Sequence, residues 1–183
     1  MNLGETYVLD GIDRQLLSEL QTDCKRSLKE IGAAVGLSAP SVMERVRKLE
    51  NAGIIKGYHA LLEARRVGLD IAAFIGVSIS DPTLLAAFED WADSIPQVME
   101  CHHVTGGHTL LLKVKTRNTE ALEQLISRIR SLDGVAGTET MVVLSTHTER
   151  AEVALPPGEP ASEPRRRKRP RRSADSSESP QSS

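Results

Sequence analysis

The stretch LSAPSVMERVRKLENAGII, residues 37–55, decides how the first third of the chain folds. Its apolar residues recur at spacings of three and four, which predicts a helix whose inner stripe is Val42, Val46 and Leu49. Arginine and lysine occupy much of the remaining surface of this helix. The question is whether this basic surface contacts a partner or only faces water.

The limits of this helix can also be read from the sequence. Ser38 or Ala39 begins it, and Pro40 is compatible with the first turn, where amide N–H groups have no intrahelical acceptor. Gly53 is suited to ending it. The residues that follow, IIKGYHALL at 54–62, favour a strand with a bend at its glycine.

Two further helices are predicted before this one. In LDGIDRQLLSELQTD, residues 9–23, leucines and an isoleucine recur at helical spacing, and Asp10 or Asp13 can accept the free amides of the first turn. Next comes a short helix that starts with a capping box formed by Ser27 and Glu30. The residues expected to be buried on the short helix are Ile31, Ala34 and Val35.

A short helix, a turn containing Gly36 and a second helix with outward basic residues form the helix-turn-helix pattern, whose second helix enters the DNA major groove. The alternative is a solvated surface on which Glu44 and Lys48 form a weak pair. The capped helix and the glycine turn favour double-stranded DNA as the partner. The residues predicted to contact DNA are Ser38, Pro40, Ser41, Glu44, Arg45, Arg47 and Lys48.

From residue 69 the apolar pattern changes to the order β-α-β-β-α-β. This order predicts an α+β, ferredoxin-like domain, in which two helices cover one face of a four-stranded antiparallel sheet. The other face needs a partner, so we expect homodimerisation through it. The strand-like segments are 69–79, 97–106, 108–115 and 135–147, and the helical segments are 83–95 and 118–132.

Four fragments, in this order, resemble the Lrp/AsnC family of bacterial transcription regulators: LDGIDRQLLSELQTD, LSAPSVMERVRKLENAGIIKGYHALL, VMECHHVTGGHTLLLKV and DGVAGTETMVVL. The resemblance covers about residues 7–148. It implies a winged helix-turn-helix joined by a linker strand to a ligand-sensing ferredoxin-like domain. It also implies dimers that often assemble into octamers, with a small molecule, usually an amino acid, bound between dimers. The domains expected are 1–58 for DNA binding, 59–68 for the linker strand, 69–150 for sensing and oligomerisation, and 151–183 for a tail.

The ligand loop of the family typically reads threonine-glycine-aspartate-tyrosine-aspartate, where this chain has TGGHT. An aspartate suits the ammonium group of a free amino acid, and Thr109 cannot supply that charge. This difference argues against an ordinary amino acid as effector. Either the protein has no amino-acid effector, or it binds an amino-acid-like ligand with an anionic or neutral polar group that His108 and the backbone amides can meet. The residues predicted to bind the effector are Thr105, Gly106, Gly107, His108 and Thr109.

The segment ECHHVTGGH raises two alternatives, a metal site and an enzyme, because Cys101, His102, His103 and His108 are close in sequence. Neighbouring side chains on a strand point to opposite faces, so His102 cannot join Cys101 and His103 without a bulge. Cys101 and His103 could form a nucleophile and base, but no third orienting group or phosphate loop accompanies them. We therefore expect no metal, no cofactor and no enzymatic activity.

Beyond Ala151 the chain consists largely of proline, serine, glutamate and arginine, which predicts a disordered tail. Seven of the 23 lysine and arginine residues lie in RRRKRPRR, although the formal net charge of the whole chain is -2. We expect auxiliary contacts to DNA phosphates; a solvated tail and, in a eukaryotic host, a nuclear-import signal are the alternatives. The residues concerned are Arg165, Arg166, Arg167, Lys168, Arg169, Arg171 and Arg172.

The two cysteines lie far apart without a secretory signal, and no apolar run approaches the roughly 20 residues of a membrane span. These features predict a cytoplasmic, nucleoid-associated protein with no membrane partner. The predicted function is a sequence-specific, DNA-binding transcription regulator. The alternatives are an architectural nucleoid protein with little sequence specificity and a ligand-sensing oligomer whose DNA-binding domain has lost its role.

Overall fold

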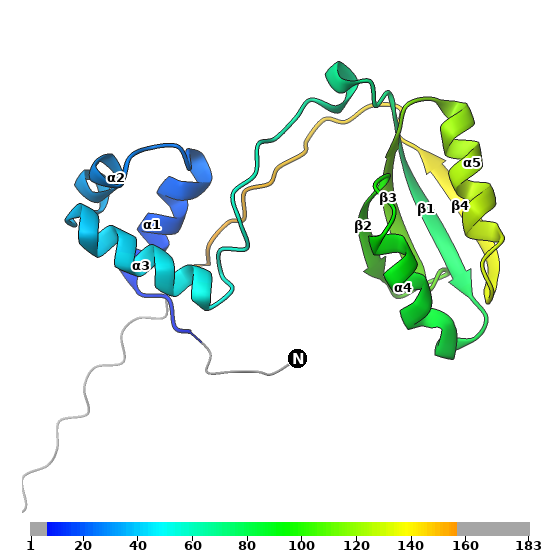
Figure 1. The fold of residues 1–183 in the computed structure, drawn as a ribbon, viewed down its shortest axis with the longest axis horizontal. Coiled ribbons are helices and arrows are strands. Elements are labelled where there is room, and N and C mark those ends of the chain that lie inside the picture. Colours follow the sequence, from blue (N-terminus) through cyan, green and yellow to red (C-terminus); the bar gives the residue numbers. More distant parts are fainter. Residues whose placement is uncertain (1–6, 157–183) are drawn as a thin grey trace, which may run out of the picture. The chain divides into compact units, whose positions relative to one another are not determined.

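The computed structural model describes residues 7–156, which form two compact units. The first unit comprises residues 7–57 and 152–156, and the second comprises residues 58–151. The first unit contains three helices, and the second contains a sheet with two helices (Figure 1). The helices of the first unit are α1 (Gly11–Thr22), α2 (Leu28–Val35) and α3 (Ala39–Asn51).

Local capping determines where these three helices begin. The Asp10 side chain accepts the Asp13 amide, and the Asp13 side chain accepts the Asp10 amide, so α1 starts with a reciprocal box. Ser27 and Glu30 form the predicted box at α2. Ser38 caps α3, and a proline lies in the first turn of that helix. All three predicted helices are therefore confirmed.

The first unit has a small apolar core between its helices. Ala34, predicted to be buried, is exposed; Gly32 of the same helix is buried in its place. A Cβ on Gly32 would overlap the backbone carbonyl of Leu37, so the following turn lies directly over this glycine. The buried core residues are Leu16, Leu17, Ile31, Val35, Val42 and Leu49.

The prediction of a strand over residues 54–62 was wrong, and the linker at 59–68 is not a strand either. These residues have no regular structure apart from a short 3-10 turn at Ala64–Val67. A strand forms only where a neighbouring strand completes its backbone hydrogen bonds. Within residues 7–156 no strand is paired with residues 54–68. An apolar sequence pattern cannot supply that neighbour.

The second unit has the predicted β-α-β-β-α-β order. All its strand pairs are antiparallel, and the strand order is β2-β3-β1-β4. No helix within residues 7–156 is long and apolar enough to span a membrane. The elements are β1 (Ile71–Ile79), α4 (Leu85–Asp93), β2 (Val98–His103), β3 (Leu110–Thr116), α5 (Thr119–Arg130) and β4 (Val135–Val142), with a 3-10 turn (Pro82–Leu84) before α4.

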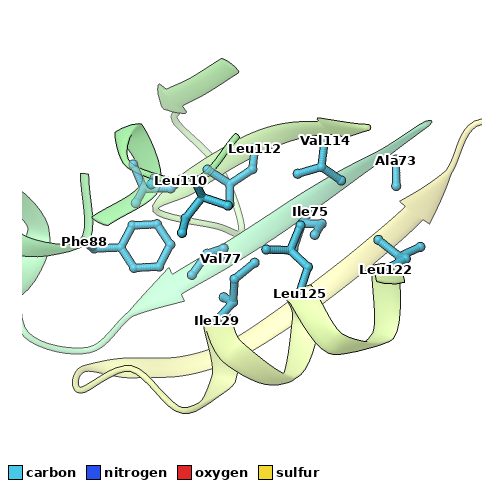
Figure 2. Packing of buried hydrophobic residues seen from close by; sticks show 12 residues of the cluster. Ala73, Ile75, Val77, Phe88, Leu110, Leu112, Val114, Leu122, Leu125 and Ile129 are labelled. Atoms are coloured by element: carbon cyan, nitrogen blue, oxygen red, sulfur yellow. The ribbon is translucent and has the colours of Figure 1, made fainter. Parts of the chain in front are cut away.

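Alternation along the central strands separates the two faces of this sheet. One face carries the main core, which packs against α4 and α5 (Figure 2). Its side chains include Ala73, Ile75, Val77, Leu110, Leu112 and Val114 from the strands and Phe88, Leu122, Leu125 and Ile129 from the helices. Neither helix covers the opposite face, here called the bare sheet face (Figure 1). The register places Phe74, Gly76, Leu111, Lys113, Glu139 and Met141 on the bare sheet face.

Candidate nucleic-acid interface and effector loop

The turn between α2 and α3 is short and tightly bonded. Gly36 ends α2 with a φ of 72°, a left-handed conformation that glycine adopts without a steric penalty. The Leu37 amide then donates to the Gly32 carbonyl at 2.8 Å. Sequence reasoning missed the role of Gly32; its available signal was a glycine inside a helix, where alanine is ordinarily preferred. The turn thus fixes how α3 leaves α2.

The outer surface of α3 carries most of the predicted DNA-contacting residues. Ser38, Pro40, Glu44 and Lys48 are exposed, and Ser41 is half-buried. Glu44 and Lys48 form the surface ion pair that their spacing of four residues allows, with Oε1 and Nζ 2.8 Å apart. Their hydrogen bond lowers the pKa of Glu44 and raises that of Lys48. Because both groups are exposed, a DNA phosphate can replace the carboxylate at the ammonium group at little cost.

Ser41, Glu44 and Lys48 share one flank of α3, and Arg47 lies on the opposite flank, where it is exposed. Among residues 7–156 the structure shows no ion pair or hydrogen bond of its guanidinium group. A guanidinium without a protein partner can contact a phosphate or a base edge without first breaking an intramolecular bond.

Arg45 is placed differently from its neighbours on α3. Its Nη1 donates to Oδ2 of Asp10 at 2.8 Å and to Oδ1 of Asp13 at 2.7 Å. Asp13 is only 2% exposed, and its other carboxylate oxygen also accepts the Tyr7 hydroxyl at 3.3 Å and the Asp10 amide at 3.2 Å. This group of bonds, here called the acid clamp (Asp10, Asp13 and Arg45), ties α3 to the start of α1. The structure therefore gives Arg45 an intramolecular role that the sequence analysis did not foresee.

The predicted effector loop divides into two parts. Thr105, Gly106 and Gly107 are exposed. By contrast, the Thr109 hydroxyl accepts a hydrogen bond from the Ile79 amide at 3.0 Å, so this side chain is already bonded to the end of β1.

His108 turns back onto the bare sheet face. A Cβ on Gly76 would overlap its ring, which shows that the ring lies directly on β1. Its Nε2 is 2.9 Å from Oε2 of Glu139, and its Nδ1 is 3.4 Å from Oγ of Ser78. The loop thus leaves the first three predicted residues accessible to a ligand, while the last two already have protein partners.

The cysteine and histidines of β2 alternate between faces as predicted. Cys101 and His103 pair with Leu112 and Leu110 of the core face, whereas His102 is on the opposite face. His102 Nε2 is 3.0 Å from Oε2 of Glu100. On the core side, burial raises the pKa of the Cys101 thiol, and the charge of Glu89 adds to this effect.

The predicted tail has a contact that the sequence analysis did not foresee at its start. Residues 152–156 belong to the helical unit, and Leu155 packs against the core of that unit. The auxiliary DNA-contacting residues predicted at 165–172 lie outside the described part of the chain.

Known protein families match both units. Residues 9–50 match the AsnC-type helix-turn-helix domain, and residues 72–153 match the Lrp/AsnC ligand binding domain. The HTH-type transcriptional regulator FL11 of Pyrococcus horikoshii is 35% identical over 147 residues, which cover 80% of this chain and 97% of the relative. These matches favour transcription regulation over the architectural alternative.

Solved structures agree with this similarity. The structure of E. coli AsnC aligns with a TM-score of 0.74 at 28% identity, covering 80% of this chain and 99% of that chain. A transcriptional regulator from Neisseria meningitidis, solved as a complex with L-Met, aligns with a TM-score of 0.75 at 28% identity, covering 80% and 97% of the two chains. The similarity therefore extends over both units.

Proposed function

The chain belongs to the Lrp/AsnC family of HTH-type transcriptional regulators, and from this premise we propose that it reads specific DNA sequences as a homo-oligomer whose assembly or DNA affinity responds to a small ligand. Because such a regulator acts on chromosomal DNA, we place it in the cytoplasm with the nucleoid. The observation that carries the proposal is the capped α2, the Gly36 turn and the exposed polar surface of α3.

In this proposal α3 is the recognition helix that enters the major groove. Lys48 and Arg47 supply positive charge on its two flanks, and Ser41 and Glu44 can exchange hydrogen bonds with base edges. We propose that Arg45 positions α3 instead of contacting DNA, because its guanidinium group is already paired with Asp10 and Asp13. The residues proposed to contact DNA are Ser38, Pro40, Ser41, Glu44, Arg47 and Lys48.

The bare sheet face is the proposed dimer interface. Phe74 and Leu111 are only half-buried there, and Met141 is 46% exposed. Covering such a face with the same face of a second copy removes apolar side chains from water and produces a closed two-fold dimer. Sedimentation velocity distinguishes a monomer, this dimer and an octamer built from four such dimers.

The proposed ligand site includes the exposed loop residues Thr105, Gly106 and Gly107. The L-Met complex of the Neisseria meningitidis regulator supports an amino-acid-like ligand as the class to test. Because the loop has no carboxylate to meet an ammonium group, we propose a ligand with an anionic or neutral polar group, bound through backbone amides. Ligand binding should raise the melting temperature by mass action.

Selection of bound fragments from the genome of the source organism tests this function. The proposal expects a few fragments with a shared motif, protected from cleavage over a defined footprint. Uniform recovery of all fragments would contradict sequence-specific binding and favour an architectural role. Failure to recover any fragment would contradict DNA binding altogether.

A further inference from the structure

One large apolar side chain lies on the exposed surface of α3. Met43 is the fifth residue of this helix and is 44% exposed. Within the described helical unit it belongs neither to the buried core nor to the half-buried apolar side chains packed against that core. Packing inside the unit therefore does not explain an apolar residue at this position. The other exposed residues of α3 are Pro40, Glu44, Arg47, Lys48, Glu50 and Asn51.

Met43 shares a flank of α3 with Arg47. The two residues are four apart in the sequence, so their side chains lie one above the other along the helix. Ser41 and Lys48 lie on the opposite flank, and Val42 is buried in the core. The flank of Met43 thus combines an apolar group with a cation, and a DNA groove offers a contact to each of them, in its base edges and its phosphates.

Isolated exposed apolar residues are common on protein surfaces and by themselves need no partner. Met43 differs from them in its position on the helix that is proposed to enter the major groove. In helix-turn-helix proteins the N-terminal residues of the recognition helix contact base edges, and Met43 lies in the N-terminal half of α3. Leu28, which is 37% exposed, lies instead at the start of α2.

The chemistry of the major groove determines what an apolar side chain can read there. The bases present hydrogen-bond donors and acceptors on this surface, together with one apolar group, the C5 methyl of thymine. An apolar side chain placed against a donor or acceptor removes its water without replacing the hydrogen bond, which costs free energy. Against the thymine methyl, the same side chain removes apolar surface of both partners from water. Methionine is suited to this contact, because its flexible, polarisable thioether adapts to the shape of its neighbour.

We propose that Met43 is a specificity-determining residue that reads the C5 methyl group of one thymine in the site bound by α3. The inference rests on the proposed DNA-binding function and names one base contact within it. The contact selects by apolar burial, whereas Ser41 and Glu44 select by hydrogen bonds. Burial of one such carbon contributes about 0.8 kcal/mol, which corresponds to about a fourfold change in Kd.

Replacement of thymine by deoxyuridine tests the inference, because the two bases differ only in the C5 methyl group. The motif recovered by genomic selection is synthesised with each of its thymines replaced in turn, and the Kd of the full chain is measured for every duplex. The same series is measured for Met43→Ala. Leu28→Ala is the matched control, because it removes a similarly exposed apolar side chain from α2. Hydrogen exchange of α1–α3 confirms that each variant is folded.

We expect deoxyuridine at one position to weaken binding of the unmodified chain about fourfold. Met43→Ala should bind thymine and deoxyuridine at that position equally well, because the side chain that contacts the methyl group is absent. Leu28→Ala should retain the full difference. The protein variant and the modified base thus form a double-mutant cycle that isolates this one contact.

Three results would overturn the inference: a selected motif without thymine, a series in which no deoxyuridine weakens binding, and a difference that persists undiminished in Met43→Ala. If Met43→Ala lowered the protection of α3, Met43→Gln would take its place, because glutamine keeps the length of the side chain and makes its end polar. Failure of the proposed function is a separate outcome, in which the full chain does not distinguish the selected motif from its scrambled form.

Discussion

Nη1 of Arg45 lies 2.7 Å from Oδ1 of Asp13, so the helix proposed to read DNA is bonded to the start of α1 through a carboxylate that is only 2% exposed. Side chains near a base edge can discriminate between bases only when their helix is held in a fixed orientation. The pair gives α3 such a support from within the chain. In the proposed function Arg45 therefore positions α3, whereas the exposed Lys48 is proposed to contact DNA.

The first prediction concerns the stability of this clamp. Arg45→Ala leaves the buried Asp13 carboxylate without its cation, which we expect to lower the free energy of unfolding of the helical unit by about 2 to 3 kcal/mol. Hydrogen exchange of residues 11–51 measures this change separately from the sheet unit. Lys48→Ala is the control, because an exposed pair contributes little to stability. Identical protection in Arg45→Ala and the unmodified chain would show that the clamp does not support α3.

The same two variants distinguish positioning from phosphate contact. Lys48→Ala should reduce the salt slope of DNA binding by about one unit, as expected when one phosphate contact is lost. Arg45→Ala should lower affinity and leave the slope unchanged. If the salt slope fell by the same amount in Arg45→Ala, Arg45 would itself contact a DNA phosphate.

The second prediction concerns the turn. Alanine ordinarily stabilises a helix interior relative to glycine by about 1 kcal/mol, but Gly32→Ala would place a Cβ against the Leu37 carbonyl. We therefore expect Gly32→Ala to lower the melting temperature of the helical unit and to weaken DNA binding. Gly11→Ala, in α1 and with no atom within 4 Å of the added Cβ, is the matched control. A melting temperature of Gly32→Ala at or above that of the unmodified chain would contradict the close approach of the turn.

The third prediction concerns acid sensitivity. The hydrogen bond from the Asp13 amide, together with Arg45, lowers the pKa of Asp10 in the folded state. The unfolded chain therefore takes up this proton first as the pH falls, so the stabilisation is present above the ordinary aspartate range and is lost below it. In Asp10→Asn the stability of the helical unit should decrease less steeply between about pH 5 and pH 3. Urea unfolding at each pH measures this stability. An equally steep fall in both chains would remove Asp10 as the cause.

The fourth prediction concerns the effector loop. A Cβ on Gly107 meets no atom within 4 Å, and an aspartate at 109 can accept the Ile79 amide as the Thr109 hydroxyl does. Gly107→Asp with Thr109→Asp should therefore fold and acquire carboxylates for an ammonium group. We expect L-Met at millimolar levels to raise the melting temperature of this variant and to leave the unmodified chain unchanged. The isosteric pair Gly107→Asn with Thr109→Asn is the control. A response of the unmodified chain to L-Met would show that the loop does not need these carboxylates.

Much of the fold follows from local sequence, because the signals involved act over a few residues. The capping box of Ser27 and Glu30 and the left-handed Gly36 were both predictable, since each is a short-range backbone requirement. The order of strand-like and helical segments likewise predicted the β-α-β-β-α-β arrangement of the second unit. The expected strand over 54–62 failed for the opposite reason, because a strand depends on a partner elsewhere.

The candidate site was less predictable, because its decisive contacts are distant in sequence. Helical spacing predicted that Arg45 lies outside the buried stripe of α3, but Asp13 is 32 residues away and periodicity does not identify it. His108 meets Glu139 across 31 residues. Composition made residues 152–156 look like the start of a tail, although Leu155 packs against the core of the helical unit.

The central claim, that α3 gives this chain sequence-specific DNA binding, is tested most directly by the ratio of two dissociation constants. The Kd for a fragment recovered by genomic selection is compared with the Kd for the same fragment with its motif scrambled, both at about 150 mM salt. The account predicts a ratio of at least about a thousand, of which most is lost when Ser41 and Glu44 are replaced by alanine. A ratio near one, with affinity that falls steeply as salt rises, would contradict the account and leave only binding to the phosphate backbone.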